Sequence, residues 1–327
     1  MSQPTQRPFD RAGCPPLVPD AALALDIAAR VTGRTPRTAR RFATGTQHYV
    51  FEVEFAEGPA VVVRLGNASA QAEMAGAVRL SARLRPRGVP LPAILGADVE
   101  AALPWLVLER LPGADLGAVI ADLSEAQLEQ IAGHVAKAQV AAAGTESAGR
   151  YGYAVHPEEA PHATWSGVLA DNLHRARRRI GAAQLFDPAL VDVSEEILDR
   201  LRADLDRIAP TPFLHDTTTK NVIVTPDGRF SGIVDVDDLC FGDPRYPAAL
   251  TLAVLSARRA PTHYVTAWLR HAGAVDDAIF RFYVDLFHLD LMGEHGHTFN
   301  GNQAPSAPQG RAALLRAFEE NRRLLGA

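Results

Sequence analysis

The sequence has little cysteine and no excess of basic charge. Its 327 residues include two cysteines, Cys14 and Cys240, which lie far apart and show no metal-ligand spacing. This usage disfavours a disulfide framework or a zinc ribbon and is typical of a cytoplasmic protein. The formal net charge is -5 and the sequence pI is about 6.1. Such a balance argues against nucleic-acid or anionic-membrane partners, which require a basic surface.

Long apolar runs are missing as well. No stretch of about 18 apolar residues occurs, so we expect no membrane-spanning helix. Residues 1–19 are polar and proline-rich and lack the apolar core of a signal peptide, and we expect them to form a poorly ordered arm. The remaining chain can bury a core, because 47% of the residues are hydrophobic.

Two kinds of apolar periodicity divide the rest of the chain. Strand patterns and short turns predict two antiparallel strand pairs, at residues 49–55 with 60–65 and at 93–99 with 104–111. Helical spacing occupies residues 20–31, 70–85 and most of the chain after Ser124. Asp20 and Ser124 are candidate N-caps, and Gly33 is a candidate helix stop. We therefore expect an α+β protein with a small strand-rich N-lobe (20–112) and a larger helical C-lobe (113–327). A cleft between two such lobes is a common ligand site.

One hairpin is embedded in the helical half. Its apolar runs, VIV and GIV, flank Asp227-Gly228, which is a strong hairpin signal. Asp216 and Asn221 precede the first strand and Asp235 ends the second, so strand pairing brings these three residues to one end of the hairpin. Hard oxygen ligands of this kind suit Mg²⁺ completed by substrate phosphates. A carboxylate outside the metal shell can accept a proton from an attacking hydroxyl.

A plainer interpretation exists for each carboxylate taken alone. Asp216 fits an N-cap or an Asx turn, and Asp237 and Asp238 fit a solvated strand edge. These single positions do not distinguish a site from local structure.

Taken together, these segments carry a resemblance. The pattern Asp216-x-x-x-x-Asn221, a hairpin ending in Asp235, and the following GDP (242–244) resemble the aminoglycoside phosphotransferase and choline kinase-like family, which has a protein-kinase-like fold. Four segments fit in the family's order between about residues 41 and 250. The resemblance implies that Asp216 is the catalytic base and that Asn221 and Asp235 hold Mg²⁺ beside the phosphates of ATP or GTP.

The resemblance also implies nucleotide contacts from the N-lobe. Gly45 falls in the segment that covers the nucleotide, and Arg64 falls where the family places a cation that grips the phosphates. Glu73 is then the ion-pair partner of Arg64. Main-chain groups near Glu109 and Leu111, in the hinge that joins the lobes, bind the base. The alternative is that Arg64 and Glu73 are exposed surface charges.

The loop after Asp216 departs from the family pattern. The family places a histidine two positions before the aspartate, whereas this chain has Leu214 there and His215 next to the aspartate. His215 can brace the loop from a shifted backbone, or other contacts can replace it. Lys220, at the end of TTTK, can point toward the transferred phosphate or toward solvent.

Residues 288–297 hold three histidines and two acids without a known zinc spacing, which disfavours a metal site and a hydrolase built on it. Asp290 and Glu294 lie one helical turn apart and can present negative charge to an amine-bearing substrate, or can form an exposed helix face. The arginine-rich segment 175–179 fits a solvated helix face.

The resemblance implies a small-molecule kinase, with an aminoglycoside-type hydroxyl as the first acceptor to consider. Another metabolite such as choline, a sugar or an amino alcohol is an alternative acceptor. A nucleotide-binding pseudokinase scaffold is an alternative of another class, although such a scaffold has no chemical need for Asp216, Asn221 and Asp235. The sequence does not fix the oligomeric state.

Overall fold

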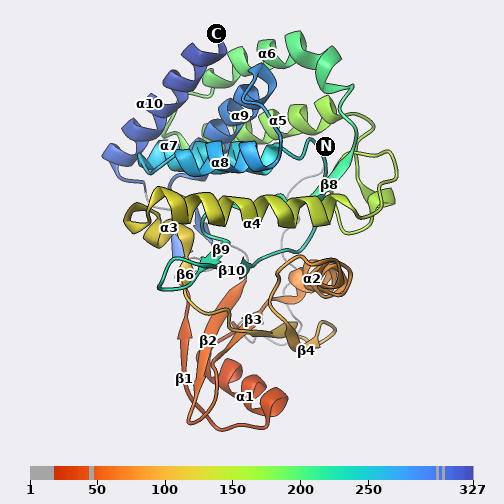
Figure 1. Cartoon of the computed structure of the whole chain (residues 1–327), viewed down its shortest axis with the longest axis vertical. Helices are drawn as coiled ribbons and strands as arrows, with labels where there is room; N and C mark the ends of the chain where they lie inside the picture. Colours follow the sequence, from red (N-terminus) through yellow and green to blue (C-terminus); the bar gives the residue numbers. More distant parts are fainter. Residues whose placement is uncertain (1–17, 44–47, 300–301, 304–305, 327) are drawn as a thin grey trace.

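The computed structural model describes residues 18–43, 48–299, 302–303 and 306–326. They form a strand-rich N-terminal lobe and a larger, mainly helical C-terminal lobe (Figure 1). This confirms the α+β, two-lobe architecture predicted from the sequence. None of the helices in these ranges combines the length and apolarity needed to cross a membrane.

The N-terminal lobe is built on a five-stranded antiparallel sheet in the order β1-β2-β3-β5-β4. Its elements are α1 (Ala21–Thr32), β1 (Pro36–Arg41), β2 (Tyr49–Phe55), β3 (Val61–Leu65), α2 (Gln71–Leu84), β4 (Ile94–Asp98) and β5 (Trp105–Glu109). Alternation along β2 turns Phe51 and Val53 toward a core shared with Ile27 of α1. Helix α1 begins where Asp20 accepts the Leu23 amide at 2.8 Å and ends at Gly33, as predicted.

The C-terminal lobe surrounds two small sheets, ordered β10-β9-β6 and β7-β11-β8. Its helices are α3 (Leu116–Val119), α4 (Glu125–Ala143), α5 (Trp165–Ala183), α6 (Leu190–Leu205), α7 (Tyr246–Arg258), α8 (His263–His271), α9 (Ala278–Glu294) and α10 (Pro308–Leu325). Its strands are β6 (Ala114–Asp115), β7 (Gly152–Ala154), β8 (Thr211–Phe213), β9 (Val222–Val224), β10 (Phe230–Ile233), β11 (Leu239–Gly242), β12 (Thr298–Phe299) and β13 (Asn302–Gln303). Ser124 and Gln127 form a capping box that starts α4. In Figure 1 the β6, β9 and β10 strands lie between α4 and the N-lobe sheet.

One hydrophobic cluster joins the two lobes. Leu80 and Leu84 of α2 share it with Leu214, which precedes Asp216, and with Ile233 at the end of β10. The start of the predicted catalytic loop and the end of the hairpin are therefore packed against an N-lobe helix. This packing places the hairpin at the junction of the lobes.

Candidate active site

The β9/β10 hairpin brings Asn221 and Asp235 to one end. Val222 pairs with Ile233 in the antiparallel register, and the Val234 amide donates to the Asn221 carbonyl at 2.9 Å. The opposite end turns at Gly228, whose φ of 78° only glycine adopts freely. The Asp-Gly turn and the convergence of the two polar residues are thus both as the sequence predicts.

Asp216 is fixed beside the same hairpin end. Asn221 Nδ2 donates to the Asp216 carbonyl at 2.8 Å, Thr218 donates to Asp216 Oδ1 at 2.8 Å, and Lys220 Nζ lies 3.1 Å from Asp216 Oδ2. Burial raises the pKa of Asp216, but the charges of Lys220 and His215 and the Thr218 hydrogen bond outweigh it, so this pKa lies below its usual range. Asp216 is therefore an ionised carboxylate held at the end of the hairpin.

The backbone of Asp235 is unusual. Its φ is 65°, in the left-handed region. The other non-glycine residues with positive φ in the described ranges, Gln184 and Arg259, are helix C-caps, where this geometry is common. Asp235 caps no helix, and holding it there costs about 1 kcal/mol, which its surroundings must offset. Such backbone outliers cluster at functional sites.

Arg64, at the centre of the sheet on β3, is a buried cation. Both of its Nη atoms donate to the carboxylate of Asp237, with an Nη1–Oδ1 distance of 2.6 Å, and Nη2 lies 3.5 Å from Asp235 Oδ1. Burial lowers the pKa of Arg64, but Asp237 and Asp235 raise it above its ordinary value. The interpretation of Arg64 as an exposed surface charge is therefore wrong.

The carboxylate that contacts Arg64 is Asp237 rather than Glu73, which corrects the predicted pairing. Glu73 has a half-exposed side chain, and its Oε2 lies 3.5 Å from Nε2 of His48. The buried His48 ring lies close to the carboxylates of both Glu73 and Asp237, because its Nε2 is also 3.6 Å from Asp237 Oδ2. The carboxylate that forms two hydrogen bonds with the Arg64 guanidinium therefore comes from the loop after β10, and not from α2 as predicted.

A pocket of about 370 Å³ opens between the lobes. Arg64, Asn221 and Asp235 line it together with the predicted hinge residues Glu109 and Leu111. Apolar side chains complete part of the wall, including Val50, Val62, Leu108 and Ile223. Five residues predicted to contact nucleotide or metal therefore share one cavity. Of the two other predicted contacts, Glu73 does not line this pocket and Gly45 lies outside the described residues.

Part of the main chain between the lobes is already hydrogen-bonded within the protein. The Glu109 amide donates to Ala93 at 2.8 Å, and the Glu109 carboxylate accepts the Ala93 amide at 3.0 Å. The Leu111 carbonyl accepts a hydrogen bond from the Arg110 guanidinium. Among the residues described by the structure, no acceptor faces the Leu111 amide. Leu111 lines the pocket, so its amide is one candidate donor for a ligand.

The loop that carries Asp216 is braced by two side chains. His215 Nδ1 lies 3.0 Å from Asp238 Oδ1, and the His215 ring packs edge-on against Tyr153. Gln139, buried on α4, accepts the Leu214 amide at 3.0 Å and donates to the Leu214 carbonyl at 2.9 Å. Both possibilities for bracing this loop are therefore realised. The sequence gives no signal for Gln139, because a lone glutamine in a helical pattern is usually exposed.

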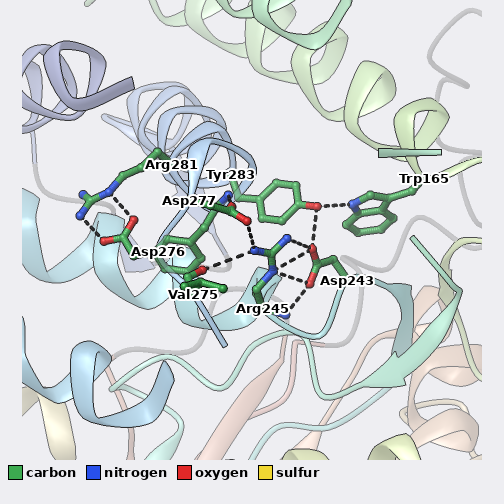
Figure 2. Close-up of polar contacts among 9 residues, drawn as sticks. Trp165, Asp243, Arg245, Val275, Asp276, Asp277, Arg281 and Tyr283 are labelled. Carbon is green, nitrogen blue, oxygen red and sulfur yellow. Dashed lines mark hydrogen bonds and ion pairs between the residues drawn. The ribbon is translucent and has the colours of Figure 1, made fainter. Parts of the chain in front are cut away.

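The aspartate of the GDP turn anchors the fold behind the site (Figure 2). Asp243 is buried, pairs with Arg245 at 2.7 Å and accepts the Tyr283 hydroxyl at 3.0 Å. That hydroxyl accepts the indole N–H of Trp165 at 2.8 Å, and Arg245 continues to Asp277 at 2.8 Å. The network ties the end of β11 to α5 and α9.

The acidic residues of α9 have different partners. Asp290 Oδ1 lies 3.2 Å from Arg179 Nη1 and 3.6 Å from Arg175 Nη2. These two arginines therefore pair with α9, whereas Arg178 of the same segment is exposed, as predicted for a solvated face. Burial and the charge of Asp290 raise the pKa of Glu294, and the charges of Asp216 and Lys220 also act on it. Glu294 therefore lies within electrostatic range of the predicted base.

The histidines near the end of α9 form no metal cluster. His288 is fully buried and its Nε2 lies 3.0 Å from the Ser256 hydroxyl. In the part of the chain that the structure describes, no group of three or more His, Cys, Asp or Glu residues could hold a metal ion. A hydrolase site built on these histidines has no support.

The chain is similar to a known protein family and to several solved structures. The model of a family described as the phosphotransferase enzyme family matches residues 38–283. A thermostable mutant of the aminoglycoside phosphotransferase APH(4)-Ia, in its apo form, is similar in structure at 18% identity and a TM-score of 0.62, covering 93% of this chain and 100% of that one. No curated protein matches the sequence.

Two further solved structures are similar. A putative fructosamine-3-kinase from Thermobifida fusca YX-ER1 matches at 19% identity and a TM-score of 0.61, covering 91% of this chain and 98% of that one. The streptomycin-ATP complex of APH(2")-IIa matches at 13% identity and a TM-score of 0.61, covering 94% of this chain and 97% of that one. At such identities these structures show the shared fold.

Proposed function

This chain belongs to the phosphotransferase enzyme family, and we propose that it transfers the γ-phosphoryl group of ATP or GTP to a hydroxyl group of a small molecule. The observation that carries the proposal is the shared pocket. It combines a cation on the sheet (Arg64), a free hinge amide (Leu111) and two oxygen ligands (Asn221, Asp235), with Asp216 fixed next to Asn221. These are the groups that phosphoryl transfer requires.

The proposed roles follow from the chemistry of each group. The Leu111 amide binds the edge of the base, and Arg64 neutralises the phosphates. Asp216 orients the acceptor hydroxyl and takes its proton as that oxygen attacks the γ-phosphorus. Catalysis then rests on positioning and charge stabilisation, because the protein forms no covalent bond to the phosphoryl group.

The residues present fit Mg²⁺. Asn221 Nδ2 is committed to the Asp216 carbonyl, which leaves the Asn221 side-chain oxygen for a ligand. The Asp235 side chain is half exposed on the same pocket wall. Two protein oxygens with phosphates and waters are a typical magnesium shell. When bound, the ion would neutralise phosphate charge. A nucleotide-consuming reaction also suits the cytoplasmic location expected from the sequence.

We propose an aminoglycoside-type molecule as the first acceptor class. Two of the similar structures are aminoglycoside phosphotransferases, one of them with streptomycin bound. Because Asp290 is balanced by Arg175 and Arg179, Glu294 is the acid of α9 better placed to meet an acceptor amine. A sugar, choline or another amino alcohol is the second class, since the fold is shared with a putative fructosamine-3-kinase.

The test is an acceptor screen. Purified protein is assayed for magnesium-dependent ATP and GTP consumption with aminoglycosides, amino alcohols and sugars, and phosphorylated products are identified by mass spectrometry. Asp216→Asn should lower kcat by about 100-fold or more while nucleotide binding persists. Full turnover in Asp216→Asn would reject the assigned base. Nucleotide binding without turnover by the wild-type protein would favour a scaffold, and resistance conferred on a susceptible host would test the aminoglycoside class.

A further inference from the structure

Lys220 lies between the predicted base and the nucleotide pocket. Its ammonium is 3.1 Å from Asp216 Oδ2, and its side chain lines the pocket that also contains Arg64, Asn221 and Asp235. Half of the side chain is exposed, so its end is free to move. The residue therefore touches the base and faces the space assigned to the phosphates.

Lys220 is paired with the carboxylate of Asp216. Arg64 is already engaged in two hydrogen bonds with Asp237. The partner of Lys220 is Asp216, and the Asp216 carboxylate must be released from this ion pair before that carboxylate can accept a proton.

We propose that Lys220 is a catalytic residue that binds the phosphoryl group in transit. Its ammonium pairs with Asp216 in the free enzyme and moves to the γ-phosphoryl oxygens when a nucleoside triphosphate fills the pocket. This inference rests on the proposed function and adds a residue to it. Lysine suits the task because its compact charge and three donors sit on a flexible stem.

The step balances with Lys220 unchanged. A bond forms between the acceptor oxygen and the γ-phosphorus, and the bond from that phosphorus to the β-phosphate bridging oxygen breaks, leaving its electron pair on the nucleoside diphosphate. The hydroxyl proton goes to the freed Asp216 carboxylate. The Lys220 ammonium stabilises negative charge on the transferring oxygens and keeps its protons throughout.

The chain offers an internal control for chemical labelling. Its 33 basic residues include only two lysines, Lys220 and Lys137. Lys137 is exposed on α4 and lines no part of the described pocket. Trace labelling of the native protein with acetic anhydride, read by mass spectrometry, therefore reports the two lysines separately.

Nucleotides with and without a γ-phosphoryl group distinguish contact between Lys220 and that group from simple occupancy of the pocket. Saturating magnesium AMP-PNP should reduce acetylation of Lys220 by about tenfold, whereas most of the acetylation should remain with magnesium ADP. Lys137 should be labelled equally in every sample. Equal labelling of Lys220 with AMP-PNP and without nucleotide, or equal protection by ADP, would overturn the inference.

Kinetics supply the second measurement. Lys220→Met should lower kcat by about 100-fold with a smaller change in nucleotide KM, and Lys220→Arg should restore part of the rate. Lys137→Met should match the wild type. Wild-type kcat in Lys220→Met would overturn the inference and leave the proposed function standing. If the wild-type protein transfers no phosphoryl group, the proposed function fails, while labelling still decides whether Lys220 contacts the γ-phosphoryl.

Discussion

Arg64 and Asp237 form a two-bond ion pair although 173 residues separate them in the chain. The pair joins the centre of the N-lobe sheet to the loop that follows β10. The cation proposed to bind the phosphates is therefore oriented by the same loop that carries Asp235, the proposed metal ligand. A change in this loop should alter both the proposed phosphate contact and the proposed metal site.

Asp237→Asn should destabilise the fold more than Glu73→Gln. The first change removes the carboxylate that forms two hydrogen bonds with the buried Arg64 guanidinium, leaving Asp235 at 3.5 Å as its charged neighbour, and should cost about 3 kcal/mol. Glu73 is half exposed, and its loss should cost under about 1 kcal/mol. Urea unfolding of both variants measures the difference. The reverse order would show that α2 holds Arg64 after all.

Gln139→Leu should destabilise the loop that carries the proposed base. The substitution leaves the buried Leu214 amide unpaired and leaves the Leu214 carbonyl with only the Thr217 hydroxyl, 3.5 Å away, at a cost of about 2 kcal/mol. We also expect a lower kcat, because Asp216 follows this braced segment. The matched control is Gln130→Leu on the exposed face of the same helix, which should change stability by less than about 0.5 kcal/mol. Equal unfolding midpoints for the two variants would contradict the bracing role.

Two buried tyrosines should respond differently to loss of their hydroxyls. Tyr283→Phe removes the donor to Asp243 and the acceptor of the Trp165 indole, and should cost about 2 kcal/mol. Within the described structure the Tyr264 hydroxyl has no hydrogen-bond partner, so Tyr264→Phe should be neutral or stabilising. Thermal unfolding of the pair tests this. Equal losses would mean that the Asp243 network adds nothing to stability.

His288 should make the fold acid-sensitive. Burial lowers its pKa from 6.5 to about 4, so between these values the unfolded chain binds a proton that the folded chain does not. Unfolding then takes up a proton, and the stabilisation, fully present above about pH 6.5, is lost progressively toward about pH 4. The loss is about 3 kcal/mol over this window.

His288→Gln should remove this component. The difference in unfolding free energy between about pH 7 and pH 4 should shrink by about 3 kcal/mol relative to the wild type. Equilibrium denaturation at a series of pH values provides the measurement. An unchanged pH dependence would assign the acid sensitivity to other groups.

Glu294→Gln should raise the KM of an amine-bearing acceptor by about tenfold, because one charged hydrogen bond is lost. The KM for nucleotide should not change. Asp290→Asn should instead lower stability, since Arg175 and Arg179 lose their shared partner. Steady-state kinetics with both substrates separate these effects, and a shift in nucleotide KM alone would contradict the acceptor role of Glu294.

The sequence predicted the features of the fold and the site that depend on residues close together in the chain. Asp227-Gly228 fixed the β9/β10 register, and with it the convergence of Asn221 and Asp235. The caps at Asp20 and Ser124 located two helix starts. In each case the relevant interactions span only a few residues, so the sequence pattern contains them.

Contacts between residues far apart in the chain could not be predicted from the sequence in the same way. Glu73 and Asp237 are both carboxylates at reasonable positions, and only the packing of α2 and the hairpin loop decides which one reaches Arg64. Strand β11 (Leu239–Gly242) is buried throughout and shows no alternation, so periodicity does not reveal it. Strand β1 (Pro36–Arg41) is an edge strand rich in arginine, which apolar patterns also miss.

The hydrophobic cluster shared by α2, Leu214 and Ile233 bears on how the chain can be divided. Residue 112 is the lobe boundary predicted from the sequence. A chain cut there would expose Leu80 and Leu84 on one fragment and Leu214 and Ile233 on the other. Each fragment would keep the cluster that lies within its own lobe but would expose its part of the shared one. We therefore expect the lobes to fold as one cooperative unit, so that excising either half yields insoluble polypeptide rather than an independent module.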